Sequence, residues 1–252
     1  MANYPSLRGK RVFVTGGGTG IGEAIVQAFV EQGAVVSFVD IAREASEALC
    51  RRLADAGFDA PVYRHCDIAD IAALQRTMAE LAAQLGDVDI LVNNAANDQR
   101  HDIANVSLDY WNERIAINQR PMFFTCQAVL PGMKKKGGGA IVNFSSMSWH
   151  AKGAGYPVYA TTKAAVVGLT RSLARDLGPF GIRVNTVTPG WVMTERQLAL
   201  WVDDAAEAEI AKAQCLPGKL MPHDVARMVL FLGADDSRMC TAQDFVVDAG
   251  WT

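Results

Sequence analysis

The sequence predicts an α/β fold: a doubly wound parallel sheet with helices on both faces, in a single domain over residues 1–252. Three observations favour this class. Short β-rich runs alternate with helical patterns along the chain, as in consecutive βαβ units. A glycine-rich turn follows the first run, where a strand would lead into a helix. Half of the 252 residues are hydrophobic, which is enough for one large core.

Composition excludes several classes of protein. The net charge is −3 with both signs interspersed, so the chain lacks the basic surface of a nucleic-acid-binding protein. No apolar run approaches the ~20 residues of a membrane-spanning helix, and the N-terminus has no signal-peptide pattern. The five cysteines lack disulfide or metal-site spacing. We therefore expect a cytoplasmic protein with reduced thiols and without a metal, nucleic-acid or membrane partner.

Seven strands and the helices between them follow from the alternating patterns. The expected strands are residues 10–15, 34–39, 61–65, 88–92, 140–144, 182–188 and 244–248. After the helix that starts near residue 21, the expected helices are 43–56, 71–85, 108–119, 122–136, 156–177 and 223–233. Pro121 should interrupt the helical stretch around it. Residues 191–218 have a less regular helical pattern that suggests a lid.

The glycine-rich turn after the first strand is the first candidate binding element. Its spacing, G-x-x-x-G-x-G, is looser than the common G-x-G-x-x-G pattern. Glycines permit a tight turn and a close approach to a pyrophosphate, and the following helix offers unpaired N–H groups. A purely structural turn is the alternative. The residues expected to hold a dinucleotide here are Gly16, Thr19, Gly20, Ile21 and Gly22.

Asp40 ends the second predicted strand. A carboxylate at this place can accept hydrogen bonds from the adenosine ribose hydroxyls and would repel a 2′-phosphate. Asp40 therefore favours NAD over NADP, although Arg43 lies nearby and could soften the preference. The alternative is an Asp that caps the following helix.

Polar residues also end the third and fourth predicted strands. Asp67 follows one strand, and the turn 93–96 follows the next. Ligands of such sheets lie outside the carboxyl ends of the strands, so both positions are candidates for cofactor contact. For Asp67, a helix cap is an equal alternative.

Tyr159 and Lys163 lie four residues apart in the longest predicted helix and therefore share one of its faces. A nearby cation favours the phenolate, so we expect Lys163 to lower the pKa of Tyr159 and make it a usable acid or base. Alone, the pair is a weak signal, because such pairs are commonly solvated.

Together, these motifs resemble the short-chain dehydrogenase/reductase family over nearly the whole chain. Ser146 precedes Tyr159 by thirteen residues, as in that family. Ala96 departs from the family's usual glycine, which matters only if φ must be positive there. The motifs are the segments 15–22, 93–96, 159–163 and 189–194, with Asn118 and Ser146.

The resemblance implies a Rossmann-type fold and a proton-and-hydride mechanism. Tyr159 would take a proton from a substrate hydroxyl while Ser146 holds the reacting oxygen. Lys163 would bind the nicotinamide ribose and lower the Tyr159 pKa, and Asn118 would hold a water that links Lys163 to solvent. The other implied cofactor contacts are Ile68, Asn94, Ala95, Pro189, Gly190, Val192 and Thr194.

A finer resemblance, to sugar 1-dehydrogenases within the family, rests on the runs 97–101, 146–150, 213–216 and 248–251. A sugar site needs convergent polar groups and a flat apolar wall. The runs offer polar groups, among them Gln214, and Tyr156 could add to the wall. The expected substrate contacts are Asn97, Arg100, His101, Ser146, Ser148, Trp149, His150, Tyr159 and Trp191.

The expected activity is thus NAD-dependent oxidation of an aldose to its lactone, with D-xylose, L-arabinose, D-galactose and L-fucose all open. A carbonyl, 3-oxoacyl or hydroxysteroid reductase with the same four catalytic residues is the alternative. A catalytically silent dinucleotide-binding regulator would be expected to lose Tyr159 or Lys163, and this chain keeps both. The family is usually tetrameric, so a homotetramer is expected, with Trp251 tied down near a partner subunit.

Overall fold

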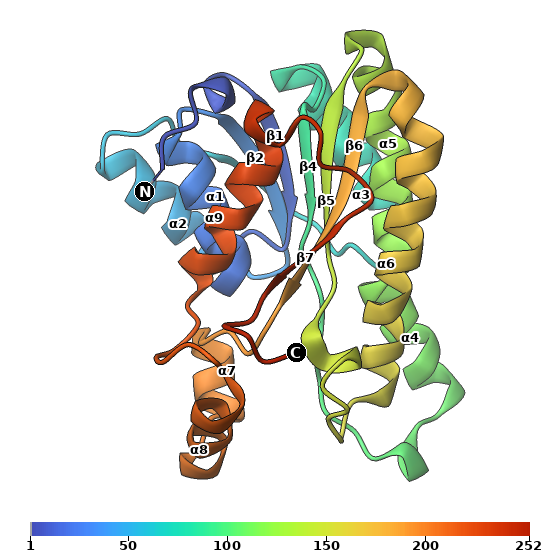
Figure 1. Cartoon of the computed structure of the whole chain (residues 1–252). Helices are drawn as coiled ribbons and strands as arrows, with labels where there is room; N and C mark the ends of the chain where they lie inside the picture. Colours follow the sequence, from blue (N-terminus) through green and yellow to red (C-terminus); the bar gives the residue numbers. More distant parts are fainter. Residues whose placement is uncertain (1) are drawn as a thin grey trace.

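The computed structural model describes residues 2–252 and contains one parallel sheet of seven strands (Figure 1). The strand order is β3-β2-β1-β4-β5-β6-β7, so the winding direction reverses between β1 and β4. Ligands of such sheets bind at the carboxyl ends near this reversal. The predicted doubly wound α/β fold is confirmed. The strands are β1 (Arg11–Thr15), β2 (Val35–Asp40), β3 (Val62–His65), β4 (Ile90–Asn93), β5 (Gly139–Phe144), β6 (Ile182–Pro189) and β7 (Asp244–Val247).

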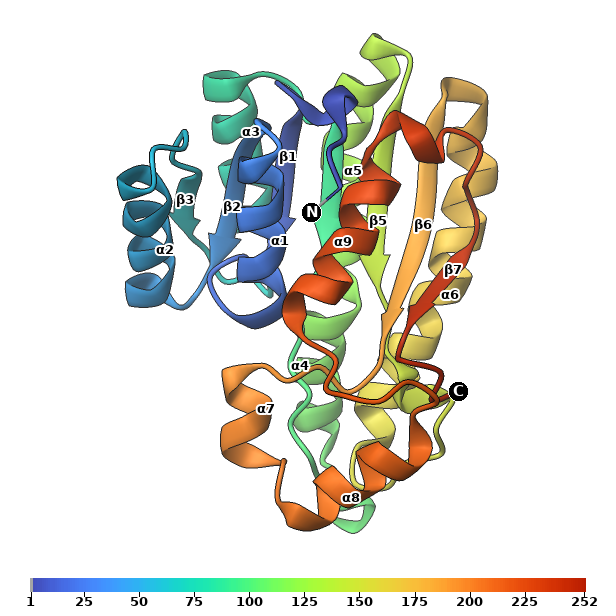
Figure 2. The ribbon, with the colours of Figure 1, turned by 60° about the vertical axis from the view of Figure 1, so that its left-hand side comes forward.

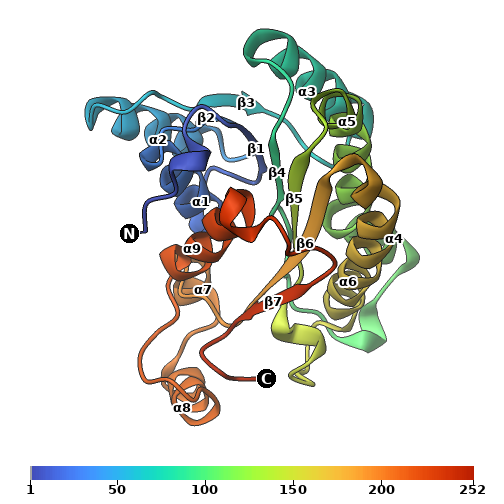
Figure 3. The same cartoon turned by 45° about the horizontal axis from the view of Figure 1, so that its top comes forward.

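The helices form two layers, and α7 and α8 lie apart from both. Figure 3 shows α1, α2 and α9 on one face of the sheet and α3 to α6 on the other. In Figure 2, α7 and α8 lie below the carboxyl ends of the strands, apart from both layers. The helices are α1 (Gly20–Glu31), α2 (Arg43–Asp55), α3 (Ile71–Leu85), α4 (Leu108–Asn118), α5 (Arg120–Lys136), α6 (Pro157–Leu177), α7 (Glu195–Leu200), α8 (Asp204–Ala213) and α9 (Pro222–Gly233).

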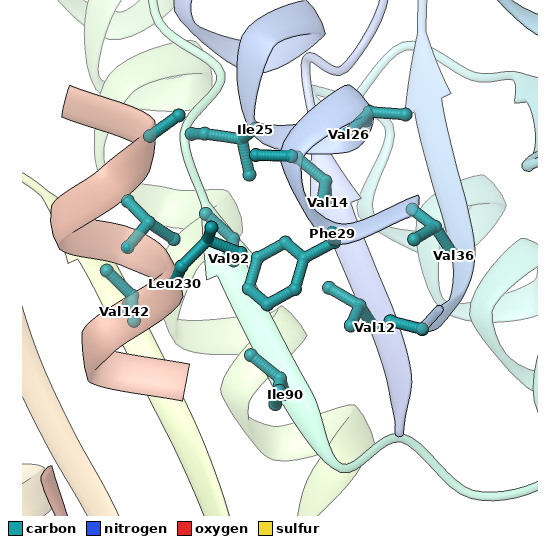
Figure 4. Packing of buried hydrophobic residues seen from close by; sticks show 14 of the residues in the cluster. Val12, Val14, Ile25, Val26, Phe29, Val36, Ile90, Val92, Val142 and Leu230 are labelled. Atoms are coloured by element: carbon teal, nitrogen blue, oxygen red, sulfur yellow. The ribbon is translucent and has the colours of Figure 1, made fainter. Parts of the chain in front are cut away.

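Successive residues of each central strand enter opposite cores, because side chains alternate across a sheet. Val12 and Val14 of β1 pack with α1 and α9, where Phe29 and Leu230 meet (Figure 4). Phe13, between the two valines, packs into the core under α3, α5 and α6. Both sides of the sheet are therefore buried, as its continuous apolar strands require.

The predicted boundaries hold to within about two residues, and the differences have local causes. α5 begins at Arg120, before the predicted residue 122, because Pro121 suits the first turn of a helix. Short 3₁₀ segments were not predicted: η1 (Pro5–Leu7), η2 (Ile103–Asn105), η3 (Met147–Trp149), η4 (Gly178–Phe180) and η5 (Asp235–Ser237). Within residues 2–252, no helix has both the length and the apolar character needed to cross a membrane.

Candidate active site

Tyr159 and Lys163 lie one turn apart near the start of α6, on the helix face that the spacing predicts. The Lys163 side chain is buried, and its Nζ donates to the Phe144 carbonyl oxygen at 2.9 Å. This bond ties α6 to the carboxyl end of β5. The same Nζ lies 5.7 Å from the centre of the Tyr159 ring. The cation and the phenol are thus neighbours at the edge of the sheet where ligands are expected.

Burial is the largest influence on the pKa values of both Tyr159 and Lys163. It raises the pKa of Tyr159 well above its ordinary 10, and the nearby Asp98 carboxylate raises it further. A hydrogen bond with Ser146 opposes this shift. Burial also lowers the pKa of Lys163 from 10.5 to about 7, which Asp98 partly offsets. The pKa of Tyr159 is thus raised and not lowered as the spacing predicts, because burial is the dominant influence.

The three serines after β5 have separate roles. The Ser145 hydroxyl donates to the Lys163 carbonyl oxygen at 2.8 Å and accepts from Trp149 Nε1 at 3.0 Å. Ser146 caps η3, where its Oγ accepts from the Ser148 N–H at 3.1 Å. Ser148 Oγ is buried and has no hydrogen-bond partner among the described residues. Ser145 thus positions the helix, whereas Ser146 lies beside the Tyr159 phenol.

Asn118 is buried at the end of α4, and its side-chain amide pairs with both the N–H and the carbonyl group of Asn97. Its Oδ1 accepts from the Asn97 N–H at 2.7 Å, and its Nδ2 donates to the Asn97 carbonyl oxygen at 3.0 Å. Pro121 carries no N–H, and the Met122 N–H donates to the Gln119 carbonyl oxygen at 3.2 Å. In a continuous helix, the Met122 N–H would donate to the Asn118 carbonyl oxygen. Because the helix breaks after Asn118, this N–H donates to Gln119 instead, and the Asn118 carbonyl oxygen is left for another partner. That carbonyl, and not the side chain, is the group suited to hold a water.

The glycine-rich turn is shaped for close backbone contact. Gly16 has a φ of +67°, and a Cβ built there would lie 2.9 Å from the Ala95 Cα. A Cβ on Gly22 would lie 1.7 Å from the Gly16 carbonyl oxygen, which no side chain tolerates. Thr19 caps α1 without a side-chain hydrogen bond. The first N–H groups of α1 therefore remain available to an anion, and the turn fits a dinucleotide pyrophosphate.

Asn94 closes this turn from the neighbouring strand. Its Nδ2 donates to the carbonyl oxygens of Thr15 and Gly16 at 3.1 and 2.9 Å. The N–H groups of Asn94 and Ala95 both donate to Thr15 Oγ1. Ala96 is absent from the described non-glycine residues with positive φ. The alanine at this family glycine position is thus tolerated, as expected.

Asp40 lies at the end of β2 against the glycine-rich turn. Its Oδ2 accepts from the Gly18 N–H and its Oδ1 from the Ala42 N–H, both at 2.8 Å. A half-buried carboxylate is therefore fixed beside the turn that would hold the pyrophosphate. It does not cap α2 at the N-cap position, which Ala42 occupies.

The helix cap after β3 is Asp70. Its side chain accepts from the Ala73 N–H at 2.9 Å at the start of α3. Asp67 is exposed and accepts from the Ala69 N–H at 2.9 Å. Ile68 is buried in the core under α3. The capping alternative for Asp67 is thus wrong, and its carboxylate remains at the sheet edge.

The segment after β6 brings the end of the sheet to the glycine-rich turn. A Cβ on Gly190 would lie 2.7 Å from Asp248, so the chain passes close to the C-terminal strand here. Val192 is buried, and Thr194 caps α7 by accepting from Gln197 N at 3.2 Å. The Thr194 methyl would lie 3.1 Å from a Cβ on Gly20. The two segments thus meet across the nucleotide side of the site.

Asp98 joins the loop after β4 to α7. Its carboxylate accepts from Arg196 Nε at 3.3 Å and from Gln197 Nε2. Gln197 Oε1 in turn accepts from Trp191 Nε1 at 3.0 Å. The sequence reasoning did not select Asp98, because nothing in its spacing marks a partner 98 or 99 positions away.

Arg100 joins the same loop to two indoles of the segment after β6. Its guanidinium carbon lies 4.5 Å from the Trp201 ring centre and 5.7 Å from that of Trp191. Such stacking leaves the edges of the guanidinium group free for hydrogen bonds. Trp201 was not predicted. Its Nε1 is buried without a hydrogen-bond partner in the described chain.

His101 has a structural role that the sequence did not reveal. Its Nε2 lies 3.3 Å from the Val158 N–H, an otherwise unpaired donor in the first turn of α6. Its Nδ1 lies 2.9 Å from the Tyr110 hydroxyl. Its own N–H donates to the Gly155 carbonyl oxygen at 2.7 Å. Both ring nitrogens therefore have partners within the chain.

The aromatic pair after β5 differs from the expected open wall. The ring centres of Trp149 and His150 are 3.5 Å apart, with an angle of 34° between the planes. His150 thus covers one face of the indole. Trp251 lies 6.3 Å from Trp191, ring centre to ring centre, so the C-terminal segment is tied down within the chain itself. Among residues 2–252, no group of three or more potential ligands is placed to hold a metal ion.

The comparisons with known proteins agree with this geometry. A family model described as enoyl-(acyl carrier protein) reductase matches residues 16–252. A D-xylose 1-dehydrogenase of Caulobacter vibrioides is 51% identical, over 99% of this chain and 98% of its own. A probable galactose dehydrogenase of Rhizobium meliloti is 45% identical, over 99% and 97%. A crystal structure of a 3-oxoacyl-[acyl-carrier protein] reductase with bound NAD from Brucella melitensis superposes with a TM-score of 0.89 at 31% identity, over 99% and 94%.

The match covers nearly the whole chain, and the structure brings the predicted family motifs together at one edge of the sheet. The chain therefore belongs to the short-chain dehydrogenase/reductase family and is an oxidoreductase.

Proposed function

We propose that the protein oxidises the anomeric carbon of an aldose to the lactone, with NAD as the hydride acceptor. The observation that carries the proposal is the polar surroundings of Tyr159. The Asp98 carboxylate and the Ser146 hydroxyl lie close enough to shift its pKa, and the Asp98 loop also carries Arg100, whose guanidinium lies over the Trp191 and Trp201 rings. A steroid or acyl chain would call for an apolar lining. The 51% identity to a D-xylose 1-dehydrogenase and the 45% identity to a probable galactose dehydrogenase support the same substrate class.

The catalytic roles follow from chemistry and position. Tyr159 accepts the proton of the C1 hydroxyl in its phenolate form, which the Lys163 ammonium favours against the effect of burial, and the Ser146 hydroxyl holds the reacting oxygen. Lys163 carries the positive charge beside the phenol and is placed to bind a ribose hydroxyl. The Asn118 carbonyl holds a water through which the proton leaves. The nicotinamide, when bound, supplies the hydride acceptor.

The nucleotide would be held mainly by backbone. The glycine-rich turn and the first N–H groups of α1 accommodate the pyrophosphate. Asp40 accepts from the adenosine ribose hydroxyls and disfavours a 2′-phosphate, which is the basis for NAD over NADP. The remaining proposed contacts are Asp67, Ile68, Asn94, Ala95, Pro189, Gly190, Val192 and Thr194.

The experiment is a turnover assay of NADH or NADPH formation with purified protein and a substrate panel. The panel holds D-xylose, L-arabinose, D-galactose, D-glucose and L-fucose, with a secondary alcohol and a steroid. We expect oxidation of at least one aldose with NAD, and loss of that turnover in Tyr159→Phe, on the order of 10³-fold. Silence on every aldose, with turnover of a ketone or acyl substrate in the reductive direction, would support the alternative of a carbonyl or 3-oxoacyl reductase.

We also propose a homotetramer. Large apolar side chains are exposed on the outer helices: Trp111 on α4 is 38% exposed and Phe123 on α5 is 47% exposed. Covering such side chains is a common reason for subunit packing. Light scattering should give four times the chain mass of 27.1 kDa. A monomer across micromolar concentrations would contradict this.

The five free cysteines support a reducing, cytoplasmic compartment.

A further inference from the structure

Gln214 is a buried amide whose hydrogen-bonding capacity is unused. It follows α8 directly and is 8% exposed. Neither its Oε1 nor its Nε2 has a hydrogen-bond partner within residues 2–252. Leaving a buried polar group unpaired is unfavourable, and here both ends of one amide are unpaired. Such a group is expected where a ligand completes the bonds.

The position of Gln214 directs it toward the substrate side of the sheet. Ala206, Ile210 and Gln214 follow at intervals of four, so they share one face of α8, and all three are buried. The Cys215 and Leu216 N–H groups donate to the Ala249 carbonyl oxygen at 2.9 and 3.0 Å. These two bonds fix the chain on the C-terminal side of Gln214. The backbone at Gln214 is therefore held in place before any ligand binds.

A series of contacts links the chain at Gln214 to the loop that carries Arg100. Cys215 Sγ donates to the Gly250 carbonyl oxygen at 3.2 Å, and Trp251, which follows Gly250, lies 6.3 Å from Trp191 between ring centres. The guanidinium of Arg100 lies over both Trp191 and Trp201. Figure 2 shows α8 below the carboxyl ends of the strands.

We propose that Gln214 is a specificity-determining residue that binds two neighbouring hydroxyl groups of the sugar through its amide. The proposal rests on the proposed function. A carboxamide presents one acceptor and one donor side by side, which matches a pair of adjacent hydroxyls that donate and accept in turn. Ser148 Oγ and Trp201 Nε1 are also buried and unpaired in the described chain. Gln214 differs in offering a donor and an acceptor from one group.

The test compares Gln214→Met with Gln84→Met in the full-length protein. Gln84 is an exposed residue of α3 that binds Arg64, far from the proposed sugar contacts. For Gln214→Met we expect kcat/KM for the preferred aldose to fall about ten- to hundredfold, the value of two neutral hydrogen bonds. The KM for NAD should stay within about twofold, and Tm should not fall, because the substitution removes unpaired buried groups. Gln84→Met should leave all three quantities unchanged.

Single-deoxy analogues of the preferred aldose separate substrate binding from a structural effect. Wild-type protein should discriminate against the analogues that lack a contacted hydroxyl, and Gln214→Met should lose that discrimination. Unchanged kcat/KM, or a loss of Tm with discrimination retained, would overturn the role of Gln214 while leaving aldose oxidation intact. Wild-type protein that turns over no aldose would overturn both proposals, which is a distinguishable result.

Discussion

The nucleotide side and the sugar side of the site are built in different ways. Around β1, β2 and β4, the side chains of Asn94 and Asp40 are paired with backbone, and the surface offered to a ligand is mainly main chain. In the segments after β5 and β6, several polar side chains are buried without partners among residues 2–252, among them Ser148, Trp201 and Gln214. The first arrangement suits a ligand common to many enzymes. The second suits one that must be distinguished by its hydroxyl pattern.

The largest expected effect on the nucleotide side comes from Gly22→Ala. The added methyl would meet the Gly16 carbonyl oxygen, so the turn must shift. We expect unfolding free energy to fall by ~1–3 kcal/mol and the KM for NAD to rise by about tenfold or more. Thermal unfolding and NAD titration measure both.

Gly168→Ala is the matched control, because a Cβ there meets nothing within 4 Å. This helix position should gain up to ~1 kcal/mol of stability and keep its KM for NAD. If Gly22→Ala and Gly168→Ala had equal effects, close approach of the backbone would not be the reason that the turn requires glycine.

Lys163→Met tests the buried cation between the two sides. The pKa of Lys163 is lowered to about 7 in the folded protein and is near 10.5 when unfolded. Between these values the unfolded chain binds more protons, so this group makes stability rise with pH, by up to ~1.4 kcal/mol per pH unit. Above about pH 10 the raised pKa of Tyr159 acts in the opposite sense, because only the unfolded chain then loses that proton.

The measurement is urea unfolding of the NAD-free protein from pH 6 to 10, for wild type and variant. The difference between the two unfolding free energies should increase with pH between about pH 7 and 10. A difference that is flat across this window would mean that Lys163 is not desolvated as described.

Asp40→Asn tests the choice of nucleotide. Removing the charge removes the repulsion of a 2′-phosphate while keeping an acceptor for the Gly18 N–H. We expect the ratio of kcat/KM for NAD over NADP to fall by about 10- to 100-fold, with the KM for sugar unchanged. An unchanged ratio would show that Asp40 does not face the adenosine ribose.

His101→Phe has the smallest expected effect and sharpens the description of the sugar side. Loss of the bonds to Val158 and Tyr110 should lower stability by ~1 kcal/mol and raise the KM for sugar only a few fold. Unfolding midpoints and steady-state kinetics give both values. A large rise in KM at unchanged stability would instead restore a direct sugar contact.

The contrast between the two sides also explains what could be predicted from sequence. The glycine-rich turn, Asp40 and the Tyr159–Lys163 pair were found because local geometry dictates their residue types or spacing. The roles of Asp98 and His101 could not be found this way. Their partners lie in α7 and at the start of α6, and no periodicity encodes which loop side chains meet across that distance.

Burial explains why the predicted direction of the Tyr159 pKa shift was wrong. The Tyr159–Lys163 spacing correctly placed the cation beside the phenol, but spacing carries no information about desolvation. Lys163 is 1% exposed, and only the packed structure shows that burial dominates both pKa values. Similarly, Asp70 rather than Asp67 caps α3, because two carboxylates near one helix start satisfy the same pattern.

The most direct test of the central claim uses the preferred aldose with deuterium at C1. If Tyr159 deprotonates the C1 hydroxyl and hydride leaves the same carbon, the label should appear in the reduced nicotinamide. A lactone should form, and kcat/KM should show a primary isotope effect. Label retained in the sugar product, with reduced nucleotide unlabelled, would contradict oxidation at the anomeric carbon.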